Sequence, residues 1–139
     1  MNDIIINKIQ SMQRCIARAR EERKLGGENF AADFSHQDAA ILNITRACEQ
    51  AIALANYVIK TQRFGIPTSS GESFDLLARK KVISEDLALR LKKMVGFRNI
   101  AVHVYHDLDI AIIESVIRKG LDDLVSFGDA VRMYEPRQG

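Results

Sequence analysis

The sequence has few residues that would break helices, cross-link the chain or anchor it in a membrane. Its 139 residues include only two prolines and two cysteines, and no run of about 18 apolar residues that could span a bilayer. Because prolines are scarce, long helices can run uninterrupted. Two cysteines make neither a disulfide framework nor a zinc site, so we interpret Cys15 and Cys48 as reduced core residues.

The start of the sequence also lacks a recognisable targeting segment. Met1-Asn2-Asp3 is not a basic leader, and no cleavage site follows it. We therefore expect a cytoplasmic protein with no membrane contact. The net charge of +2 is too small to indicate a nucleic-acid binder. The length fits one domain, which we expect over residues 1–134, with a frayed tail over 135–139.

Apolar residues recur with a helical period along most of the chain. The first predicted helix runs from Asn2, a candidate cap, to about Lys24, and Gly26-Gly27 ends it. The second begins at Ser35 and continues to about residue 64, where Pro67 prevents continuation. Asp38 stands in the capping-box position after Ser35. The apolar surface of this helix is wider than one stripe, which indicates cover on two sides, by the bundle and by a second protomer.

Three further helices complete the predicted fold. A short one spans about residues 72–80, and the next follows a Ser84 cap through Leu87, Leu91 and Met94. The last spans about residues 109–134, with Asp107 or Asp109 as its cap. No β-type alternation of useful length is present. The pattern predicts an all-α, antiparallel bundle of four long helices and one short helix.

Charge is distributed unevenly along the chain. Residues 79–98 carry seven basic side chains against two acidic ones, whereas residues 99–139 carry four basic and seven acidic. A basic stretch that leads into a candidate site favours a phosphate-backbone substrate. The alternative is an ordinary solvated helical face with Lys and Arg near helix ends.

Arg98, Asn99 and His103 supply side chains suited to RNA cleavage without a metal. That reaction needs a base for the 2′-OH proton, a cation for the charge growing on phosphorus-bound oxygens, and an acid for the leaving 5′-oxygen. Histidine serves as base or acid because its pKa lies near neutrality. Arginine serves as the cation because its planar fork matches phosphate oxygens.

The spacing of these residues leaves two geometries open. Asn99 and His103 share a face at i and i+4, so the amide can orient the imidazole. Arg98 lies five residues before His103, which is about 140° around an ideal helix. Either the helix is distorted near Gly96, or two protomers pool their residues across a two-fold axis. A dimer would supply two histidines, one as base and one as acid.

The segment Arg98-Asn99-Ile100-Ala101-Val102-His103-Val104-Tyr105 resembles the Arg-x4-His-x-Tyr motif of HepT toxins, a branch of the HEPN ribonuclease superfamily. The resemblance extends to other stretches of the chain: Met1–Ile9, Cys48-Glu49-Gln50-Ala51, Phe64-Gly65-Ile66-Pro67 and Leu91–Gly96. It therefore covers most of the sequence.

The resemblance implies a metal-independent endoribonuclease that works as a homodimer, with its cleft at the dimer interface. It implies that Arg98 and His103 are the catalytic pair, supported by Asn99 and by Glu49, which matches an acidic position common in the family. The alternative for Glu49 is a solvated or salt-bridged side chain. The resemblance implies no cofactor for this chain.

The resemblance also implies a partner, an MntA-type nucleotidyltransferase antitoxin that uses ATP. Such antitoxins transfer AMP to the tyrosine of the motif, here Tyr105. AMP on this phenol would mimic bound RNA beside Arg98 and His103 and block the cleft. Because Tyr105 lies about 200° from His103 on a helix, this geometry predicts a helix end between His103 and Asp107.

Other functions fit parts of the sequence. A degenerate HEPN protein could bind RNA or nucleotide as a passive subunit of a nucleotidyltransferase complex, and a purely structural helical dimer is a third possibility. The intact Arg98 and His103 favour the enzyme. We interpret His106 as a loop residue able to contact substrate, Tyr105 otherwise as a half-buried aromatic, and His36 as a surface residue.

Overall fold

The computed structural model describes residues 3–103 and 108–134, and the elements it contains there are helical. In chain order they are α1 (Asp3–Gly26), the 3₁₀ segment η1 (Gly27–Ala32), α2 (Phe34–Gln62), α3 (Ser70–Arg79), α4 (Glu85–His103), α5 (Ile110–Ser115), the π-helical segment η3 (Val116–Gly120) and α6 (Leu121–Met133). Because α5, η3 and α6 follow one another directly, the chain forms four long helical stretches and the short α3. The predicted all-α bundle is confirmed. The candidate cap Asn2 and the predicted tail at 135–139 lie outside the described residues.

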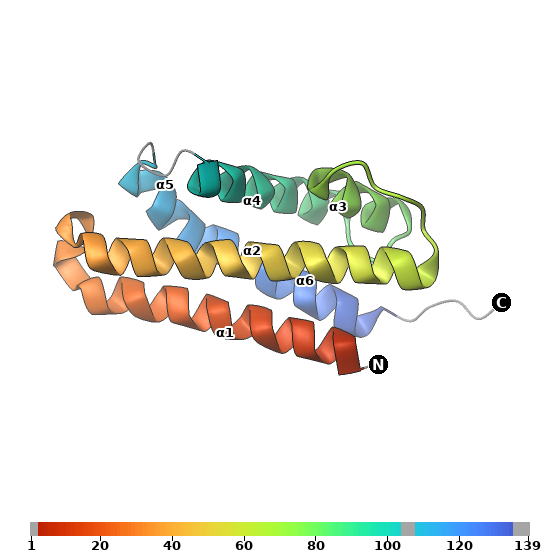
Figure 1. Cartoon of the computed structure of the whole chain (residues 1–139), viewed down its shortest axis with the longest axis horizontal. Helices are drawn as coiled ribbons and strands as arrows, with labels where there is room; N and C mark the ends of the chain where they lie inside the picture. Colours follow the sequence, from red (N-terminus) through yellow and green to blue (C-terminus); the bar gives the residue numbers. More distant parts are fainter. Residues whose placement is uncertain (1–2, 104–107, 135–139) are drawn as a thin grey trace.

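Helix α2 is the centre of the bundle. It lies alongside α1, and α4 and α3 lie on another side of it, while the α5–α6 stretch crosses behind (Figure 1). Helices α1, α3, α4 and α6 all contact α2, so its own chain buries most of the wide apolar surface predicted for it. Leu42 remains exposed over 48% of its surface, and Phe34 at the start of α2 is more exposed still. A second protomer is therefore not needed to cover the rest of this helix.

The core joins these helices through large apolar side chains. Phe74 of α3 and Phe127 of α6 pack edge to face with ring centroids 5.3 Å apart, and both are fully buried. The buried Ser73 hydroxyl donates to Asn56 Oδ1 at 2.6 Å, which satisfies a polar group between α3 and α2. Both cysteines are free, as predicted. Cys48 is a core residue, but Cys15 is only half-buried.

Several predicted helix ends are confirmed. Helix α1 ends at Gly26, and Gly27 has a φ of +56°, a left-handed conformation that suits glycine. Ser84 caps α4, because its Oγ accepts a hydrogen bond from the Leu87 N–H at 3.0 Å. Asp109 caps α5, because its Oδ1 accepts from the Ala111 N–H at 2.9 Å. At Ser84 and Asp109, a polar side chain just before an apolar helical repeat therefore identified the cap of the helix from sequence alone.

The predicted start of the second helix at Ser35, with Asp38 in a capping box, is wrong. Helix α2 begins at Phe34 and its cap is Asp33, whose Oδ1 accepts from the His36 N–H at 3.0 Å. The His36 ring lies 2.5 Å from the other Asp33 oxygen, so His36 is half-buried in the cap and is not a simple surface residue. These hydrogen bonds from His36 hold the pKa of Asp33 below its ordinary value. Asp and Ser are comparable caps, and the non-helical backbone of Asp33, with φ −97° and ψ 86°, makes it the residue before the first helical turn.

The last predicted helix is not uniform. Between α5 and α6, η3 forms a π-helical turn in which hydrogen bonds span one additional residue. Apolar periodicity does not reveal this turn, since Ile113, Ile117, Leu121 and Leu124 are buried on both sides of it. Gly120 ends η3 where the backbone passes close to Met94 of α4.

We predict that Gly120→Ala destabilises the protein by about 1–3 kcal/mol through overpacking. A Cβ at this position would lie 2.5 Å from Met94 Sδ, and Met94 is itself buried. Gly96→Ala is the matched control, because no heavy atom lies within 4 Å of the Cβ it adds. In a helix this control is expected to gain up to about 1 kcal/mol. Urea unfolding of both variants measures the difference, and equal midpoints would contradict the close contact.

Candidate active site

Helix α4 carries the three motif residues that the structure describes. It is continuous from Glu85 to His103 and passes through Gly96 without a break. The predicted alternative of a helix distorted near Gly96 is therefore wrong. Arg98 is half-buried, whereas Asn99 and His103 are exposed. An α-helix places Arg98 and His103 on different sides, as the five-residue offset requires.

Arg98 has an unusual environment for an arginine. Its Nε is buried and makes no hydrogen bond to any group in residues 3–103 or 108–134, and no described carboxylate forms an ion pair with it. Arg90, two turns earlier on the same helix, shows the ordinary arrangement: its Nε donates to Asp123 Oδ1 at 2.8 Å and its Nη1 pairs with Asp86. A half-buried cation without a carboxylate is electrostatically ready for an anion.

Cys48 of α2 contacts this part of α4. Its thiol donates to the Met94 carbonyl oxygen at 3.8 Å, which joins the two helices. Burial raises the pKa of the Cys48 thiol to about 12, the positive charge of Arg98 opposes that shift, and the Glu49 carboxylate adds to it. The α2–α4 packing therefore brings Arg98 within electrostatic range of the Cys48 sulfur. Glu49 is the next residue after Cys48 and is exposed.

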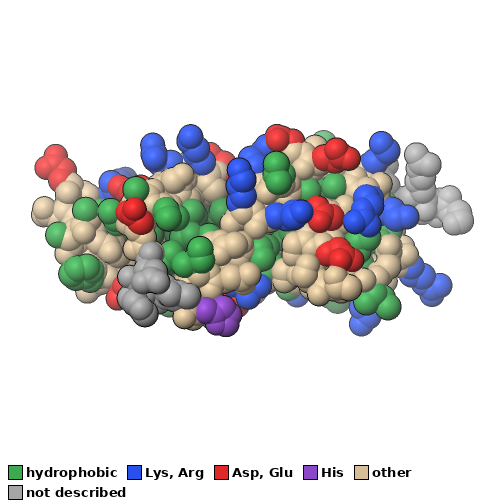
Figure 2. All heavy atoms as spheres, turned by 90° about the horizontal axis from the view of Figure 1, so that it is seen from above, with side chains coloured by type: hydrophobic (Ala, Val, Ile, Leu, Met, Phe, Trp, Pro, Cys, Tyr) green, Lys and Arg blue, Asp and Glu red, His purple; other side chains and the backbone are tan. Residues whose placement is uncertain are grey.

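The basic stretch before the motif is partly neutralised. Besides Arg90, Lys92 is paired, with its Nζ 3.1 Å from Asp75 Oδ2. Acidic side chains accompany the Lys and Arg side chains over α3 and α4 (Figure 2). Arg90 and Lys92 therefore support the alternative of an ordinary helical face for their part of the stretch, although they are ion-paired as well as solvent-exposed. Lys93 and Arg98 also belong to this basic stretch. Neither forms an ion pair with a residue in the described part of the chain.

A groove of about 580 Å³ lies between α4 and the α5–η3 segment. Its lining includes Phe97, Ile100 and Ile112, with Lys93 and Lys119 among the polar residues. Hydrophobic side chains gather in a hollow on this face (Figure 2). The sequence analysis missed this groove because its shape depends on the π-helical turn.

Some predicted features fall outside the described residues. Tyr105 and His106 are among residues 104–107, so the predicted helix end between His103 and Asp107 remains a prediction. Within residues 3–103 and 108–134, no group of three or more His, Cys, Asp or Glu side chains is arranged to hold a metal ion. No helix in that part of the chain is long and apolar enough to cross a membrane.

The helical bundle, with an arginine and a histidine near the end of one helix, agrees with comparisons to known proteins. The family model described as "Ribonuclease HepT-like" matches residues 12–131. This chain therefore belongs to the HepT-like ribonuclease family. It is 46% identical to the mRNA nuclease HepT of Shewanella oneidensis over 132 residues, which cover 95% of this chain and 98% of that protein.

Two solved structures are similar along nearly the whole chain. One is a tri-AMPylated HEPN toxin of Shewanella oneidensis in complex with an MNT antitoxin, with a TM-score of 0.90 and 46% identity over 96% of this chain and 100% of that one. The other is a toxin–antitoxin with AMP-PNP, with a TM-score of 0.88 and 46% identity over 94% of this chain and 99% of that one. The predicted family and ribonuclease class are confirmed.

Proposed function

We propose that this chain is the toxin of a type VII toxin–antitoxin pair and cleaves RNA in the cytoplasm as a metal-independent endoribonuclease, with Arg98 and His103 as its catalytic pair. The observation that carries this proposal is the half-buried Arg98 without a carboxylate partner among the described residues, on the same helix as an exposed His103. The similarity to an mRNA nuclease supports RNA as the substrate.

The cleavage step uses the RNA's own 2′-hydroxyl as nucleophile. A His103 imidazole takes the 2′-OH proton while the O2′–P bond forms, and Arg98 stabilises the charge on the two non-bridging oxygens. The P–O5′ bond then breaks, and a proton from an imidazolium passes to the leaving O5′. The products are a 2′,3′-cyclic phosphate and a 5′-hydroxyl. One proton is taken from the 2′-hydroxyl and one is given to O5′, so the enzyme has no net gain or loss of protons.

A homodimer can bring an arginine and a histidine together at one phosphate, which a single straight helix does not do. Arg98 and His103 of one straight helix are about 140° apart around the axis and about 7.5 Å apart along it. A two-fold axis near the end of α4 brings Arg98 of one protomer toward His103 of the partner subunit. The same axis supplies a second imidazole, which acts as the acid while the first acts as the base.

Asn99 and Glu49 are supporting residues in this account. Asn99 lies one turn before His103 on the same exposed side of α4 and orients the imidazole. Glu49 is exposed on α2, next to Cys48 in the chain, and forms no ion pair with Arg98 among the described residues, so we assign it a supporting electrostatic role at the edge of the site.

AMP on Tyr105 is the proposed means of inactivation. A cognate MntA-type nucleotidyltransferase attaches it at the expense of ATP, which this chain itself does not use. Tyr105 is two residues after His103. A phosphodiester there offers Arg98 an anion and occupies the substrate's place. The tri-AMPylated toxin with its MNT antitoxin supports this partner and this modification.

We predict that His103→Ala and Arg98→Ala each lower the rate of RNA cleavage by about 10²–10⁴-fold, since each removes one transition-state interaction. Arg79→Ala, at the exposed end of α3, is the charge-matched control and is expected to keep wild-type activity. A fluorescent RNA assay with and without EDTA measures cleavage, and bacterial growth during expression measures toxicity. Cleavage abolished by EDTA would refute metal independence.

The same experiment tests the alternative of a non-catalytic RNA-binding subunit. That alternative requires wild type and His103→Ala to give equal growth and equal RNA cleavage at equal amounts of soluble protein. Such a result would exclude the enzymatic toxin.

We predict that co-expression with the neighbouring nucleotidyltransferase adds AMP to the wild type and none to Tyr105→Phe, because phenylalanine lacks the acceptor oxygen. Intact-mass spectrometry measures the added groups directly. Tyr134→Phe is the matched control, since it removes a tyrosine hydroxyl outside the motif. The same AMP addition on Tyr105→Phe would refute modification at this residue.

A further inference from the structure

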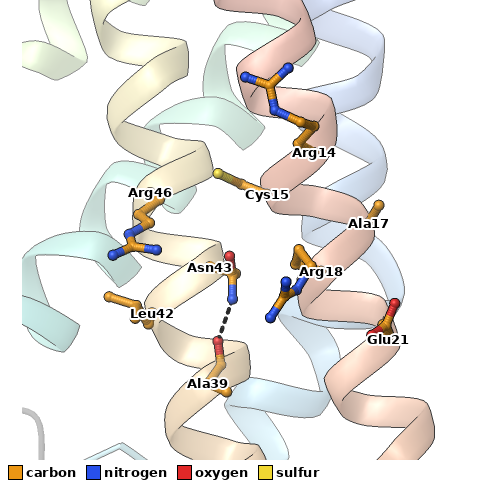
Figure 3. A pocket seen from close by; sticks show the side chains of 9 residues that line it. All are labelled: Arg14, Cys15, Ala17, Arg18, Glu21, Ala39, Leu42, Asn43 and Arg46. Carbon is orange, nitrogen blue, oxygen red and sulfur yellow. Dashed lines mark hydrogen bonds between the residues drawn. The ribbon is translucent and has the colours of Figure 1, made fainter.

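A second groove lies between α1 and α2, away from the α4 motif. Its volume is about 580 Å³, and its lining includes Arg14, Cys15, Arg18, Leu42, Asn43 and Arg46. The close-up shows Arg14, Cys15 and Arg18 coming from α1, and Leu42, Asn43 and Arg46 coming from α2, around one opening (Figure 3). Three guanidinium groups thus border one groove, with Glu21 as an acidic residue of its lining.

The arginines of the groove differ from the other arginines of α1. Arg20 and Arg23 are paired across the bundle, with Arg20 Nη2 2.6 Å from Asp122 and Arg23 Nε 2.5 Å from Glu114. Arg14 has no ion pair or hydrogen bond to any described residue, and Arg18 has only Glu22 at 3.9 Å. The arginines on the side of α1 that meets the bundle are therefore closely paired, whereas on the side that borders the groove Arg14 is unpaired among the described residues and Arg18 is only loosely paired.

The arginine that α2 contributes to the groove is unpaired as well. Arg46 is exposed and has no ion-pair partner among the described residues. Below it, Asn43 is 8% exposed and donates its Nδ2 to the Ala39 carbonyl at 2.9 Å (Figure 3). The half-exposed Leu42 adds an apolar surface beside these polar groups. A groove with positive walls and a small apolar patch suits a strand that carries both phosphates and bases.

The positive charge of the groove favours a polyanion over a second copy of this chain as its occupant. An isologous contact would place the arginine patch against the same patch of its mate, and like charges would repel. The groove and the proposed active site share helix α2, because Arg46 of the groove lies three residues before Glu49, about 4.5 Å along the axis.

We propose that the α1–α2 groove is an RNA exosite in which Arg14, Arg18 and Arg46 bind backbone phosphates of the substrate away from the cleaved bond. This inference rests on the proposed function only in taking RNA as the substrate. Arginine forks bind phosphate oxygens bidentately, and each contact contributes to affinity in a salt-dependent way.

Cys15 provides a direct probe, because it lines the groove and is half-buried and free. The full-length wild type is alkylated with N-ethylmaleimide, with and without a 2′-O-methyl oligoribonucleotide of about 16 nucleotides, which carries phosphates but no 2′-OH nucleophile. We expect the RNA analogue to slow alkylation of Cys15 several-fold. Cys48 is the internal control, because it is buried and its thiol pKa of about 12 keeps it unreactive.

Substitution of the arginines tests the same site through affinity. Arg14→Ala/Arg18→Ala is expected to abolish protection of Cys15 and to lower the slope of log K against log salt by about 1.4, at about 0.7 per lost phosphate contact. Arg20→Ala/Lys24→Ala removes two charges from the same helix outside the groove and is expected to keep protection. Thermal unfolding checks that both double variants are folded.

The outcomes separate the exosite from the proposed function. Protection in the wild type that Arg14→Ala/Arg18→Ala removes supports the exosite, even if the wild type cleaves no RNA. RNA cleavage without protection of Cys15 overturns the exosite and leaves the nuclease intact. Protection by polyglutamate but not by RNA also overturns it and assigns the groove to an acidic protein segment.

Discussion

Helix α4 packs against the bundle at Met94, and the contacts of Met94 help to set the position of Arg98, the proposed catalytic arginine. The Met94 carbonyl accepts from the Cys48 thiol of α2, and its sulfur lies against the backbone of Gly120. Met94 therefore contacts the central helix on one side and η3 on the other. Arg98 lies one turn further along α4, within electrostatic range of the same Cys48 thiol.

Partial burial makes the positive charge of Arg98 more effective toward an anion than a fully exposed charge would be. A fully exposed arginine is screened by water, and a paired one is already neutralised. Arg98 is half-buried with an unpaired Nε, while Arg90 and Lys92 on the same helix are paired with Asp123 and Asp75. Packing thus divides the basic stretch into cations that are paired, such as Arg90 and Lys92, and cations without a carboxylate partner among the described residues, such as Lys93 and Arg98. The same division on α1 separates Arg20 and Arg23 from the arginines of the α1–α2 groove.

Local signals in the sequence were sufficient to predict the helices of the fold, but they did not predict which charged side chains form ion pairs. Ser84 and Gly26-Gly27 mark helix ends through interactions within one turn, which a sequence reveals. The competition between Ser35 and Asp33 depends on backbone conformation, and the π-helical turn depends on hydrogen bonds that apolar spacing does not record.

In the candidate site, too, some features could be predicted from sequence and others depend on helix packing. The motif itself identified Arg98, Asn99 and His103, because its spacing lies within one stretch of chain. Arg90 meets Asp123 only because α4 and α6 pack together, 33 residues apart in sequence. The approach of Arg98 to the Cys48 thiol, and the groove between α1 and α2, are likewise products of helix packing.

The central claim is that Arg98 and His103 act across two protomers, and a mixed dimer tests it most directly. One wild-type chain is paired with one Arg98→Ala/His103→Ala chain by means of two affinity tags, and RNA cleavage is measured. A wild-type chain paired with an Arg79→Ala chain is the control. A site shared between protomers predicts activity near that of the doubly substituted homodimer. Half of the wild-type activity would mean that each chain holds a complete site, and would contradict the account.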